Sequence, residues 1–391
     1  MSRDGGARIY LDHNAGAPLR PEARAAMLEV LAGPPANPSS AHREGARARR
    51  LIEEARASVA TLIGARPADV VFTSGATEAN NLALRGVLPG AGGRDRLAVS
   101  AIEHASVIET AQALAASGVR VVVVPVDQAG CVDAGRVATA CDERTVLVSV
   151  GLANGEVGSV APVAEIAYAL RGRGIALHTD AAQAAGRLPV DVAALGVDLL
   201  SLSSHKLGGP PGVGALWVRP GTPLRPLLTG GPQERGRRAG TEPVAAIAGF
   251  GAAARAAAVE LPVVAARMVA LLDRLWQGLV TAVPDVVRHG PLDGARLPNT
   301  LNVRMPGCAS ESLLVLLDLA GVAVSLGSAC AAGAPEPSHV LRAMGLDDEA
   351  ARNGLRMSLG PATTTSEIDA VVDLVPRLVG RIRATSRTEV A

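Results

Sequence analysis

The sequence predicts an α/β fold, with a large domain around a mostly parallel sheet and a smaller α+β domain at the C-terminal end. From about residue 21 to about residue 260, helical patterns alternate with short apolar runs, the order expected of parallel crossovers. The runs are apolar almost throughout, as in strands buried on both faces. After about residue 258 the pattern changes to one long helical segment followed by short strands.

The elements follow from these patterns in order. The first clear helical periodicity covers residues 42–65. The apolar runs that predict strands are residues 69–74, 96–104, 119–127, 145–154, 175–183, 197–206 and 212–219. A second long helix is predicted at 260–283, short strands at 300–306 and 354–360, and a last helix from Thr365. We therefore divide the chain into an N-terminal segment (1–20) that packs with the small domain, a large domain (21–257) and the small domain (258–391).

The composition is that of an ordinary globular protein of 391 residues with a formal net charge of +1. The arginines are scattered along the sequence and form no basic stripe, so the charge pattern does not indicate a nucleic-acid or membrane partner. The first ten residues lack the apolar core of a signal peptide, and no apolar run reaches the roughly 18 residues of a membrane span. We expect a cytoplasmic protein whose partners are small molecules and other proteins.

The four cysteines are Cys131, Cys141, Cys308 and Cys330, and no two of them form a C-x-x-C motif. They indicate neither a disulfide framework nor a zinc site, and we expect no bound metal. Cys131, Cys141 and Cys308 are expected to be inert buried thiols. Cys330 lies among small residues beside a stretch rich in glycine and proline, which is typical of a mobile loop that could carry a nucleophile.

Lys206 is the single lysine of the chain, because arginine is the basic residue everywhere else. Arginine stays protonated, whereas a lysine amine can lose its proton and attack a carbonyl, so the two cannot be exchanged where an imine forms. Lys206 also follows an apolar run directly, whereas a solvated lysine is more often found on a helix face. These features make Lys206 a candidate for cofactor attachment.

Polar side chains close several of the apolar runs, where ligands bind beyond the carboxyl ends of parallel strands. They are Ser74 to Thr77, His104, Asn154, Asp180 to Gln183, and Ser203 to Lys206. A pyridoxal-phosphate site needs an amine, a carboxylate for the ring nitrogen, phosphate donors and a flat group against the ring. The strand ends offer all four.

Each candidate has a competing explanation at this point. Asp180 could cap a helix, and the turn before Thr77 could do the same instead of binding a phosphate. His104 could be a structural histidine. Arg356, on a predicted short strand, could grip an amino-acid carboxylate with two hydrogen bonds or be an ordinary surface arginine.

Together these segments resemble the cysteine desulfurases of the class V aminotransferase family over essentially the whole chain. The matching segments are YLDHNAGAP, ANPSSAH, FTSGATEANN, EHAS, ANGEVG, HTDAAQAAGRLPVD, SLSSHKLGGPPGVGALWVR, QERGRRAGT, GSAC, EPSHVLRAMGL and LRMSLG. The resemblance implies a fold-type I pyridoxal-phosphate transferase that works as a homodimer and converts L-cysteine to L-alanine. The stretch 330–337 is similar to the longer loop of the nitrogenase and iron–sulfur housekeeping type, which supplies sulfur for iron–sulfur cluster assembly or related transfer.

The resemblance also implies roles by position. Lys206 would carry the cofactor, Asp180 would meet its ring nitrogen, Gln183 its phenolic oxygen, and the catalytic His104 would stack on the ring. Ala76, Thr77, Ser203 and His205 would hold the phosphate, with Thr241 from the partner subunit. Arg356 and Asn37 would bind the substrate carboxylate. Cys330 would take the sulfur as a persulfide for an unidentified acceptor or scaffold protein, and could contact a transient iron–sulfur cluster.

Some positions depart from the family pattern. Relatives often carry two asparagines where this chain has Asn154 and Gly155, so Asn154 is expected to supply the cofactor contact. The alternatives are a selenocysteine lyase, another class V lyase or transaminase, or a non-catalytic assembly subunit. The presence of both Lys206 and Cys330 argues against a non-catalytic subunit, and Cys330 on a loop argues against a plain transaminase.

Overall fold

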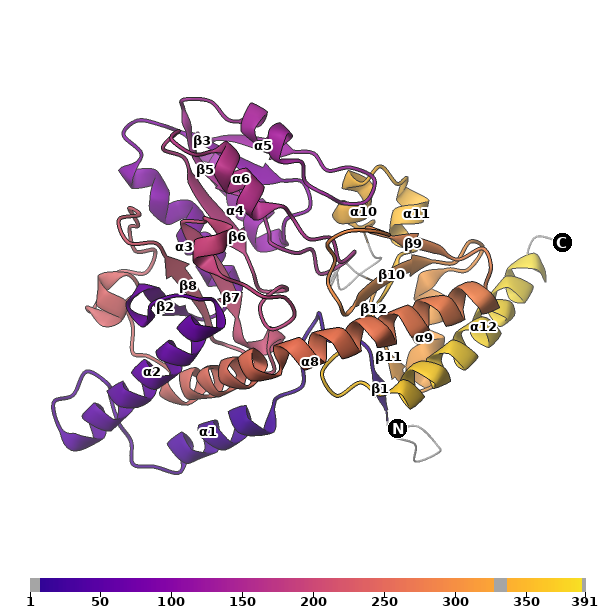
Figure 1. Cartoon of the computed structure of the whole chain (residues 1–391), viewed down its shortest axis with the longest axis horizontal. Coiled ribbons are helices and arrows are strands. Elements are labelled where there is room, and N and C mark those ends of the chain that lie inside the picture. Colours follow the sequence, from indigo (N-terminus) through magenta and orange to yellow (C-terminus); the bar gives the residue numbers. More distant parts are fainter. Residues whose placement is uncertain (1–7, 327–335, 389–391) are drawn as a thin grey trace.

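The computed structural model describes residues 8–326 and 336–388, and its centre is a seven-stranded sheet (Figure 1). The strand order is β2-β8-β7-β6-β5-β3-β4. β8 pairs antiparallel with both of its neighbours, and the other pairs are parallel. The strands of this sheet are β2 (Val70–Thr73), β3 (Arg96–Ser100), β4 (Arg120–Val124), β5 (Thr145–Ser149), β6 (Ala176–Asp180), β7 (Leu199–Ser203) and β8 (Gly214–Val218). The predicted α/β fold is confirmed.

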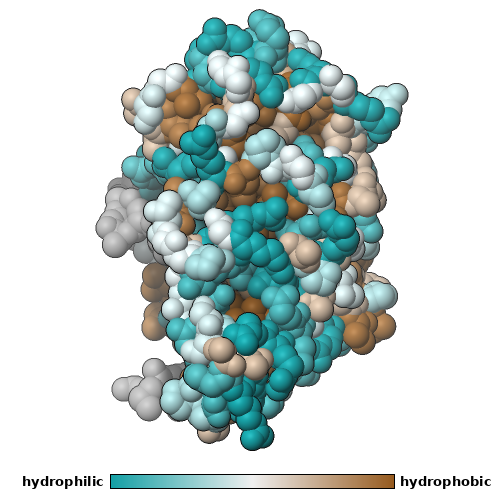
Figure 2. Space-filling view, turned by 90° about the vertical axis from the view of Figure 1, so that its left-hand side faces the viewer, coloured by the Kyte–Doolittle hydropathy of each residue, from teal (hydrophilic) through white to brown (hydrophobic). Residues whose placement is uncertain are grey.

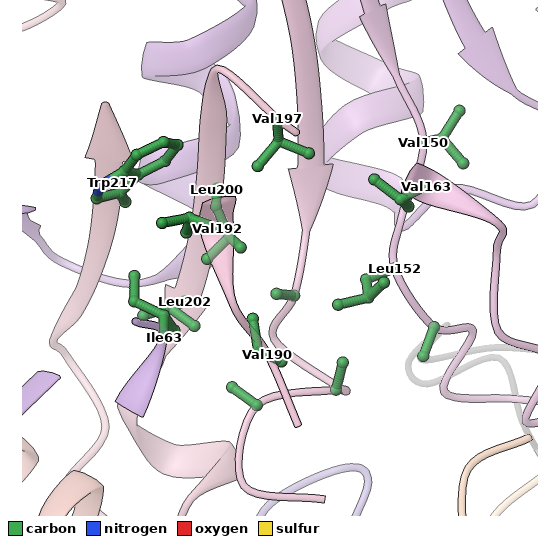
Figure 3. Packing of buried hydrophobic residues seen from close by; sticks show 14 of the residues in the cluster. Ile63, Val150, Leu152, Val163, Val190, Val192, Val197, Leu200, Leu202 and Trp217 are labelled. Carbon is green, nitrogen blue, oxygen red and sulfur yellow. The ribbon is translucent and has the colours of Figure 1, made fainter. Parts of the chain in front are cut away.

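Helices cover both faces of the sheet, because successive strand residues point to opposite sides. In β7, Leu200 and Leu202 pack into a core shared with α2 and α8, whereas Leu199 packs with α3 and α4. Figure 3 shows Leu200 and Leu202 close to Ile63 and Val192. The helices of this part are α1 (Pro21–Leu31), α2 (Arg43–Leu62), α3 (Ala76–Val87), α4 (Ala105–Ala116), α5 (Ala134–Ala140), α6 (Val163–Ala169) and α7 (Val192–Leu195). The short 3-10 turns are η1 (Pro67–Asp69), η2 (Leu88–Gly90), η3 (Ser204–Lys206) and η4 (Gln233–Gly236).

A second, antiparallel sheet lies in the C-terminal part, with the order β12-β10-β9. Leu301 and Met357 from this sheet share a separate core with α9, α12 and the second half of α8. β1 (Ile9–Tyr10) pairs in parallel with β11 (Val322–Ala323), so the N-terminal residues attach to this part of the protein. The remaining elements are β9 (Val287–His289), β10 (Thr300–Arg304), β12 (Leu355–Ser358), α9 (Ser310–Leu319), α10 (His339–Ala343), α11 (Asp348–Arg352) and α12 (Thr365–Thr388).

The long helix α8 (Val244–Ala282) runs between the two cores, as Figure 1 shows. The helical pattern in the sequence predicted a start at residue 260, and a proline such as Pro262 is common in the first turn of a helix. The helix starts earlier, since residues 244–259 are rich in alanine, the strongest helix former. Its first half packs in the core under the large sheet and its second half in the C-terminal core. The division at residues 257 and 258 therefore falls inside one helix and stays a prediction.

The surface carries both polar and apolar residues. On the face in Figure 2, hydrophobic residues form separate patches among hydrophilic ones. In residues 8–326 and 336–388, none of the helices combines the length and the apolar character that crossing a membrane requires.

A buried ion pair fixes the segment that contains η4. Arg56 Nη1 and Nη2 lie 2.6 and 2.8 Å from the two carboxylate oxygens of Glu234. The side chains are 4% and 1% exposed, and Glu234 Oε2 also accepts the Phe72 amide at 2.8 Å. Glu234 has a φ of 47°, in the left-handed region that non-glycine residues seldom adopt. The pair thus holds an unfavourable backbone conformation in place.

We expect Arg56→Met to lower the free energy of unfolding by about 3–5 kcal/mol, because Glu234 would stay buried without its counter-charge. Urea unfolding measures this loss. Arg274→Met is the matched control, since Arg274 also pairs with a carboxylate, that of Asp369, but the two side chains are 54% and 45% exposed. That control should lose less than about 1 kcal/mol. Equal losses in the two variants would contradict the prediction.

Candidate active site

The candidate residues gather at one edge of the large sheet. β2 and β7 are both antiparallel to β8, so β2 runs parallel to β7, β6, β5 and β3. The carboxyl ends of these strands therefore lie at the same edge, and the predicted strand-end residues lie at these ends or in the loops that follow them.

Lys206 ends η3, just after β7, with a partly buried side chain. Its Nζ donates hydrogen bonds to Asn14 O at 2.5 Å and Ala15 O at 2.9 Å. Burial lowers the pKa of Lys206 to about 8, and the positive charges of Arg187 and Arg356 add to this effect. A larger fraction of the amine is therefore neutral at physiological pH than in a solvated lysine, as nucleophilic attack on a carbonyl requires.

Asp180 is linked to His104 through two polar side chains that the sequence did not single out. Asn80 Nδ2 donates to Asp180 Oδ2 at 2.7 Å and to Ser106 Oγ at 2.9 Å. Ser106 Oγ lies 2.8 Å from His104 Nδ1, which also accepts the Ser106 amide at 3.1 Å. Because Nδ1 accepts, this network assigns the proton of the neutral imidazole to Nε2.

The competing explanations hold only in part. His104 has a structural role, since it caps α4 by accepting the Ser106 amide. Asp180 caps no helix, because none begins between β6 and α7, and its Oδ1 accepts the Ala182 amide at 2.9 Å in a tight turn. Both residues keep capacity for a ligand, since the His104 side chain is exposed and Asp180 is only partly buried.

Donors suited to a phosphate converge beside Gly214. Thr73 of β2 and Ser203 of β7 pair with Gly214 from opposite sides, which brings Ser203 close to the start of α3 at Ala76 and Thr77. A Cβ on Gly214 would lie 2.7 Å from the Gly75 Cα, so glycine permits this close approach. The free amides at the N-terminus of α3 favour an anion there.

The serines and the histidine after β7 differ in their surroundings. Ser203 Oγ lies 2.9 Å from His205 Nδ1. Burial, and the nearby charge of Lys206, lower the pKa of His205 to about 4, so this ring is neutral at physiological pH. Ser204 is fully buried, with its Oγ so close to Gly209 that a Cβ there would lie 2.1 Å away. Ser204 is therefore turned away from the site.

Gln183 and Asn154 both have engaged amides. Gln183 Nε2 donates to Asn14 O at 3.1 Å. Asn154 donates to Ile102 O at 3.0 Å and accepts two backbone amides of its own loop. A Cβ on Gly155 would lie 2.7 Å from Gln183 Cδ, so the Gln183 amide fills the space that a side chain at position 155 would need. The cofactor contact expected of Asn154 stays a prediction.

Arg356 is a buried residue of β12 and not a surface arginine. Its Nη2 lies 2.7 Å from Asp12 Oδ1, and its Nη1 lies 3.4 Å from Gly155 O. Asn37 is exposed in the loop between α1 and α2, at the far left of Figure 1, whereas β12 lies near the centre. The structure thus does not bring Asn37 and Arg356 of one chain together.

The remaining candidates stand apart from the edge. Thr241 is exposed between η4 and α8. Cys330 lies outside the described residues. Burial raises the pKa values of Cys131, Cys141 and Cys308, which disfavours their thiolates, although Cys131 is only partly buried.

Glu103, directly before His104, is a buried acid that sequence reasoning missed. Its Oε1 accepts the Gly151 amide at 2.7 Å, whereas its buried Oε2 has no hydrogen-bond partner among the described residues. Burial raises the pKa of Glu103 to about 8, and the negative charge of Asp180 adds to this effect. Only its position before a strand-end histidine could have drawn attention to it.

The donor set fits pyridoxal phosphate. An amine with a lowered pKa, a carboxylate held by Asn80, a histidine with an exposed side chain and the hydroxyl groups beside Gly214 all lie at one edge. Each corresponds to one part of the cofactor: its carbonyl group, its ring nitrogen, the face of its ring and its phosphate.

Comparisons with known proteins agree with this reading. The family model described as aminotransferase class-V matches residues 9–371. A protein named cysteine desulfurase IscS from Dictyoglomus turgidum is 41% identical over 97% of this chain and 96% of its own. A solved structure titled NifS-like protein is 36% identical, covers 95% of this chain and 99% of its own, and has a TM-score of 0.88. Another, titled SspA in complex with cysteine, is 33% identical, covers 91% and 100%, and has a TM-score of 0.80.

We expect Glu103→Gln to reduce the pH dependence of the free energy of unfolding of the cofactor-free protein. The folded pKa of Glu103 lies above the ordinary value of 4.5, at about 8. Stability should therefore fall as pH rises between these values, by up to about 1.4 kcal/mol per pH unit, whereas glutamine does not titrate. Urea unfolding at pH of about 5.5 and about 7.5 tests this. The same pH dependence in both proteins would refute it.

Proposed function

This chain belongs to the class-V aminotransferase family, and we propose that within it the protein is a pyridoxal-phosphate-dependent cysteine desulfurase. It would convert L-cysteine to L-alanine and receive the sulfur on Cys330. The observation that carries the proposal is Lys206, the only lysine, with a pKa lowered to about 8 at the strand edge that also holds Asp180. The relatives named as cysteine desulfurases support the choice within the family.

The residues at the edge would hold the cofactor as follows. Lys206 would attach it, the Asp180 carboxylate would bind its ring N–H, Gln183 Nε2 would donate to its phenolic oxygen, and His104 would lie on the ring. Its phosphate would contact Ala76, Thr77, Ser203 and His205, with Asn154 holding the nearby loop. When bound, the group supplies a carbonyl that condenses with amines and a ring that withdraws electrons from the substrate.

Proton transfers fall to this chain's own side chains. The Asn80 hydrogen bond keeps Asp180 oriented, and a carboxylate there stabilises a positive charge on the ring nitrogen. The Lys206 amine, whose pKa burial lowers to about 8, would serve as the base that takes a proton from the substrate. The His104 ring carries a proton on Nε2, the nitrogen that does not contact Ser106, and can donate this proton from there.

Arg356 would bind the substrate carboxylate through its guanidinium. That group is paired with Asp12 at 2.7 Å, so the substrate would share or displace this carboxylate. Asn37 lies far from β12 in the same chain, and would reach such a substrate only from a partner subunit.

A homodimer would supply both Asn37 and Thr241 to the partner's site. Leu31, which is 67% exposed, lines a cavity with Pro34, Ala36 and Val244. This cavity joins the loop of Asn37 to the start of α8, just after Thr241. Exposed apolar residues at this place favour a protein interface.

Sulfur transfer would occur at Cys330. The described residues before and after its segment are attached to the site: Ser325 exchanges backbone hydrogen bonds with Arg356, and His339 Nε2 lies 3.0 Å from Glu103 O. The Cys330 thiolate would attack the substrate sulfur, forming an S–S bond as the carbon–sulfur bond breaks. The electron pair of that bond stays with the carbon, which takes a proton and becomes the methyl group of alanine.

The persulfide would pass to an acceptor or scaffold protein in iron–sulfur cluster assembly or a related transfer, in the cytoplasm. A selenocysteine lyase is the alternative, because one fold supports several reactions of this class. Parallel assays with L-cysteine and L-selenocysteine distinguish the two functions, and turnover of selenocysteine alone would favour the lyase.

We expect Lys206→Ala to abolish the visible absorbance of the bound cofactor, because no other lysine can replace it. Absorbance spectra after incubation with pyridoxal phosphate and gel filtration measure this. Ser204→Ala is the control, since the Ser204 side chain is buried beside Gly209 and should leave the spectrum unchanged. An unchanged spectrum in Lys206→Ala would refute the cofactor assignment.

We expect Cys330→Ser to keep the visible absorbance but to lose sulfide release from L-cysteine in the presence of a reductant, because a hydroxyl cannot accept sulfur as a persulfide. Alanine and sulfide are measured together. Cys131→Ser, which changes a partly buried thiol, should retain activity. Full activity in Cys330→Ser would refute the persulfide step.

A further inference from the structure

Arg187 is a buried arginine beside the site that the proposed chemistry does not use. Arg187 follows the turn after β6 in the sequence, and it is 6% exposed. In the described part of the chain its hydrogen bonds all go to neutral oxygens: Gln183 O at 2.8 Å, Gln183 Oε1 at 2.7 Å and His13 O at 3.2 Å. Burying a guanidinium without a carboxylate partner costs free energy of folding, so the presence of Arg187 at this place needs an explanation.

Arg187, Gln183 and Lys206 all bind the carbonyl groups of residues 13–15. Arg187 donates to His13 O. Gln183 Nε2 and Lys206 Nζ both donate to Asn14 O, at 3.1 and 2.5 Å, and Lys206 Nζ also donates to Ala15 O at 2.9 Å. The three side chains are thus held in one row along a short piece of backbone.

The Arg187 contact fixes the direction of the Gln183 amide. A guanidinium only donates, so the atom that faces it must be Oε1, and Nε2 must lie on the other side. Nε2 has two hydrogens and uses one for Asn14 O. The other can donate to a ligand oxygen, whereas a flipped amide would place two donors against each other.

Arg187 also adds positive charge next to Lys206. The charged groups around Lys206 are Arg187 and Arg356, which lower its pKa, and Asp180 and Asp12, which raise it; burial is the largest cause. His205 beside it is neutral, as its pKa of about 4 shows. Arg356 is neutralised by Asp12 at 2.7 Å, but Arg187 has no such partner among the described residues. Burial lowers the pKa of Arg187 only to about 10, so it stays charged.

Lys206 remains accessible despite this environment. Arg187, Lys206 and His13 border one cavity of about 510 Å³. Water and small reagents can therefore reach the amine, and its ionisation can be measured directly.

We propose that Arg187 is a positioning residue of the active site, which directs the Gln183 amide and supplies the unneutralised positive charge beside Lys206. The part on Gln183 depends on the proposed function, because it concerns a cofactor oxygen. The part on Lys206 holds for the cofactor-free chain. The competing explanation is that Arg187 only ties down the His13 carbonyl.

The single lysine allows a direct test of the charge. Reductive methylation with ¹³C-formaldehyde labels Lys206 Nζ and the N-terminal amine, and NMR titration of the cofactor-free full chain then gives both pKa values. We expect Arg187→Met and Arg187→Gln to raise the pKa of Lys206 by about one unit, since a positive neighbour is lost. Arg187→Lys keeps the charge and should leave that pKa nearly unchanged; its additional resonance is assigned in Lys206→Ala/Arg187→Lys.

The same variants test the direction of the amide in the loaded enzyme. Glutamine and lysine at position 187 can still donate to Gln183 Oε1, whereas methionine cannot. The absorbance maximum of the bound cofactor should therefore move in Arg187→Met toward that of Gln183→Leu and stay in place in Arg187→Gln. In the pKa measurement the glutamine variant should behave like the methionine variant, because both lack the charge. In the absorbance measurement it should behave like the lysine variant, because both keep a donor. A merely structural role of Arg187 would not produce these two different groupings.

The N-terminal resonance, and Arg255→Met on the exposed side of α8, should show no change in the pKa of Lys206. If Arg187→Met does not fold, the comparison of Arg187→Gln with Arg187→Lys still decides the role of the charge. An unchanged pKa of Lys206 in the glutamine variant would overturn the proposal. Failure of the proposed function would instead appear in the unmodified protein, as a missing cofactor band.

Discussion

The row of carbonyl groups at residues 13–15 is the constraint on which the site depends. It fixes the amine of Lys206, the amide of Gln183 and the guanidinium of Arg187. The row is itself held by Asn14, which is almost fully buried and has hydrogen bonds to both parts of the protein: to Gly155 O beside the large sheet, and to the side chains of Thr300, Asn299 and Ser358. A short segment near the N-terminus thereby aligns strand ends that are far apart in the sequence.

The charges around this row oppose one another in a way that suits a lysine nucleophile. Burial disfavours both negative and positive charge, since it raises the pKa of Glu103 and lowers the pKa of Lys206. With Glu103 protonated and Asp12 paired with Arg356, Asp180 is left as the principal negative group facing Lys206. Asp180 is thus available for a positive group on a ligand, while Lys206 is kept ready to become neutral.

Most of the fold could be predicted from the sequence, because the strands of the large sheet are apolar runs closed by polar residues. The start of α8 could not, since Pro262 resembles a first-turn proline and the helix continues through it. At the site, Lys206, Asp180 and His104 stand out because each closes an apolar run. Asn80, Glu103 and Arg187 do not, because their importance comes from contacts with residues distant in sequence. Neither the engaged amide of Asn154 nor the orientation of Ser204 is visible in local composition.

The length of α8 has a consequence for how the two cores can move. A helix of 39 residues is about 58 Å long at 1.5 Å per residue, and α8 contributes side chains to both cores. A rigid rotation of one core against the other would therefore have to bend α8. Pro262 has no N–H to donate, so bending there sacrifices fewer hydrogen bonds than elsewhere along the helix. Within α8, bending therefore costs least at Pro262, more than fifty residues away from Lys206 in the sequence.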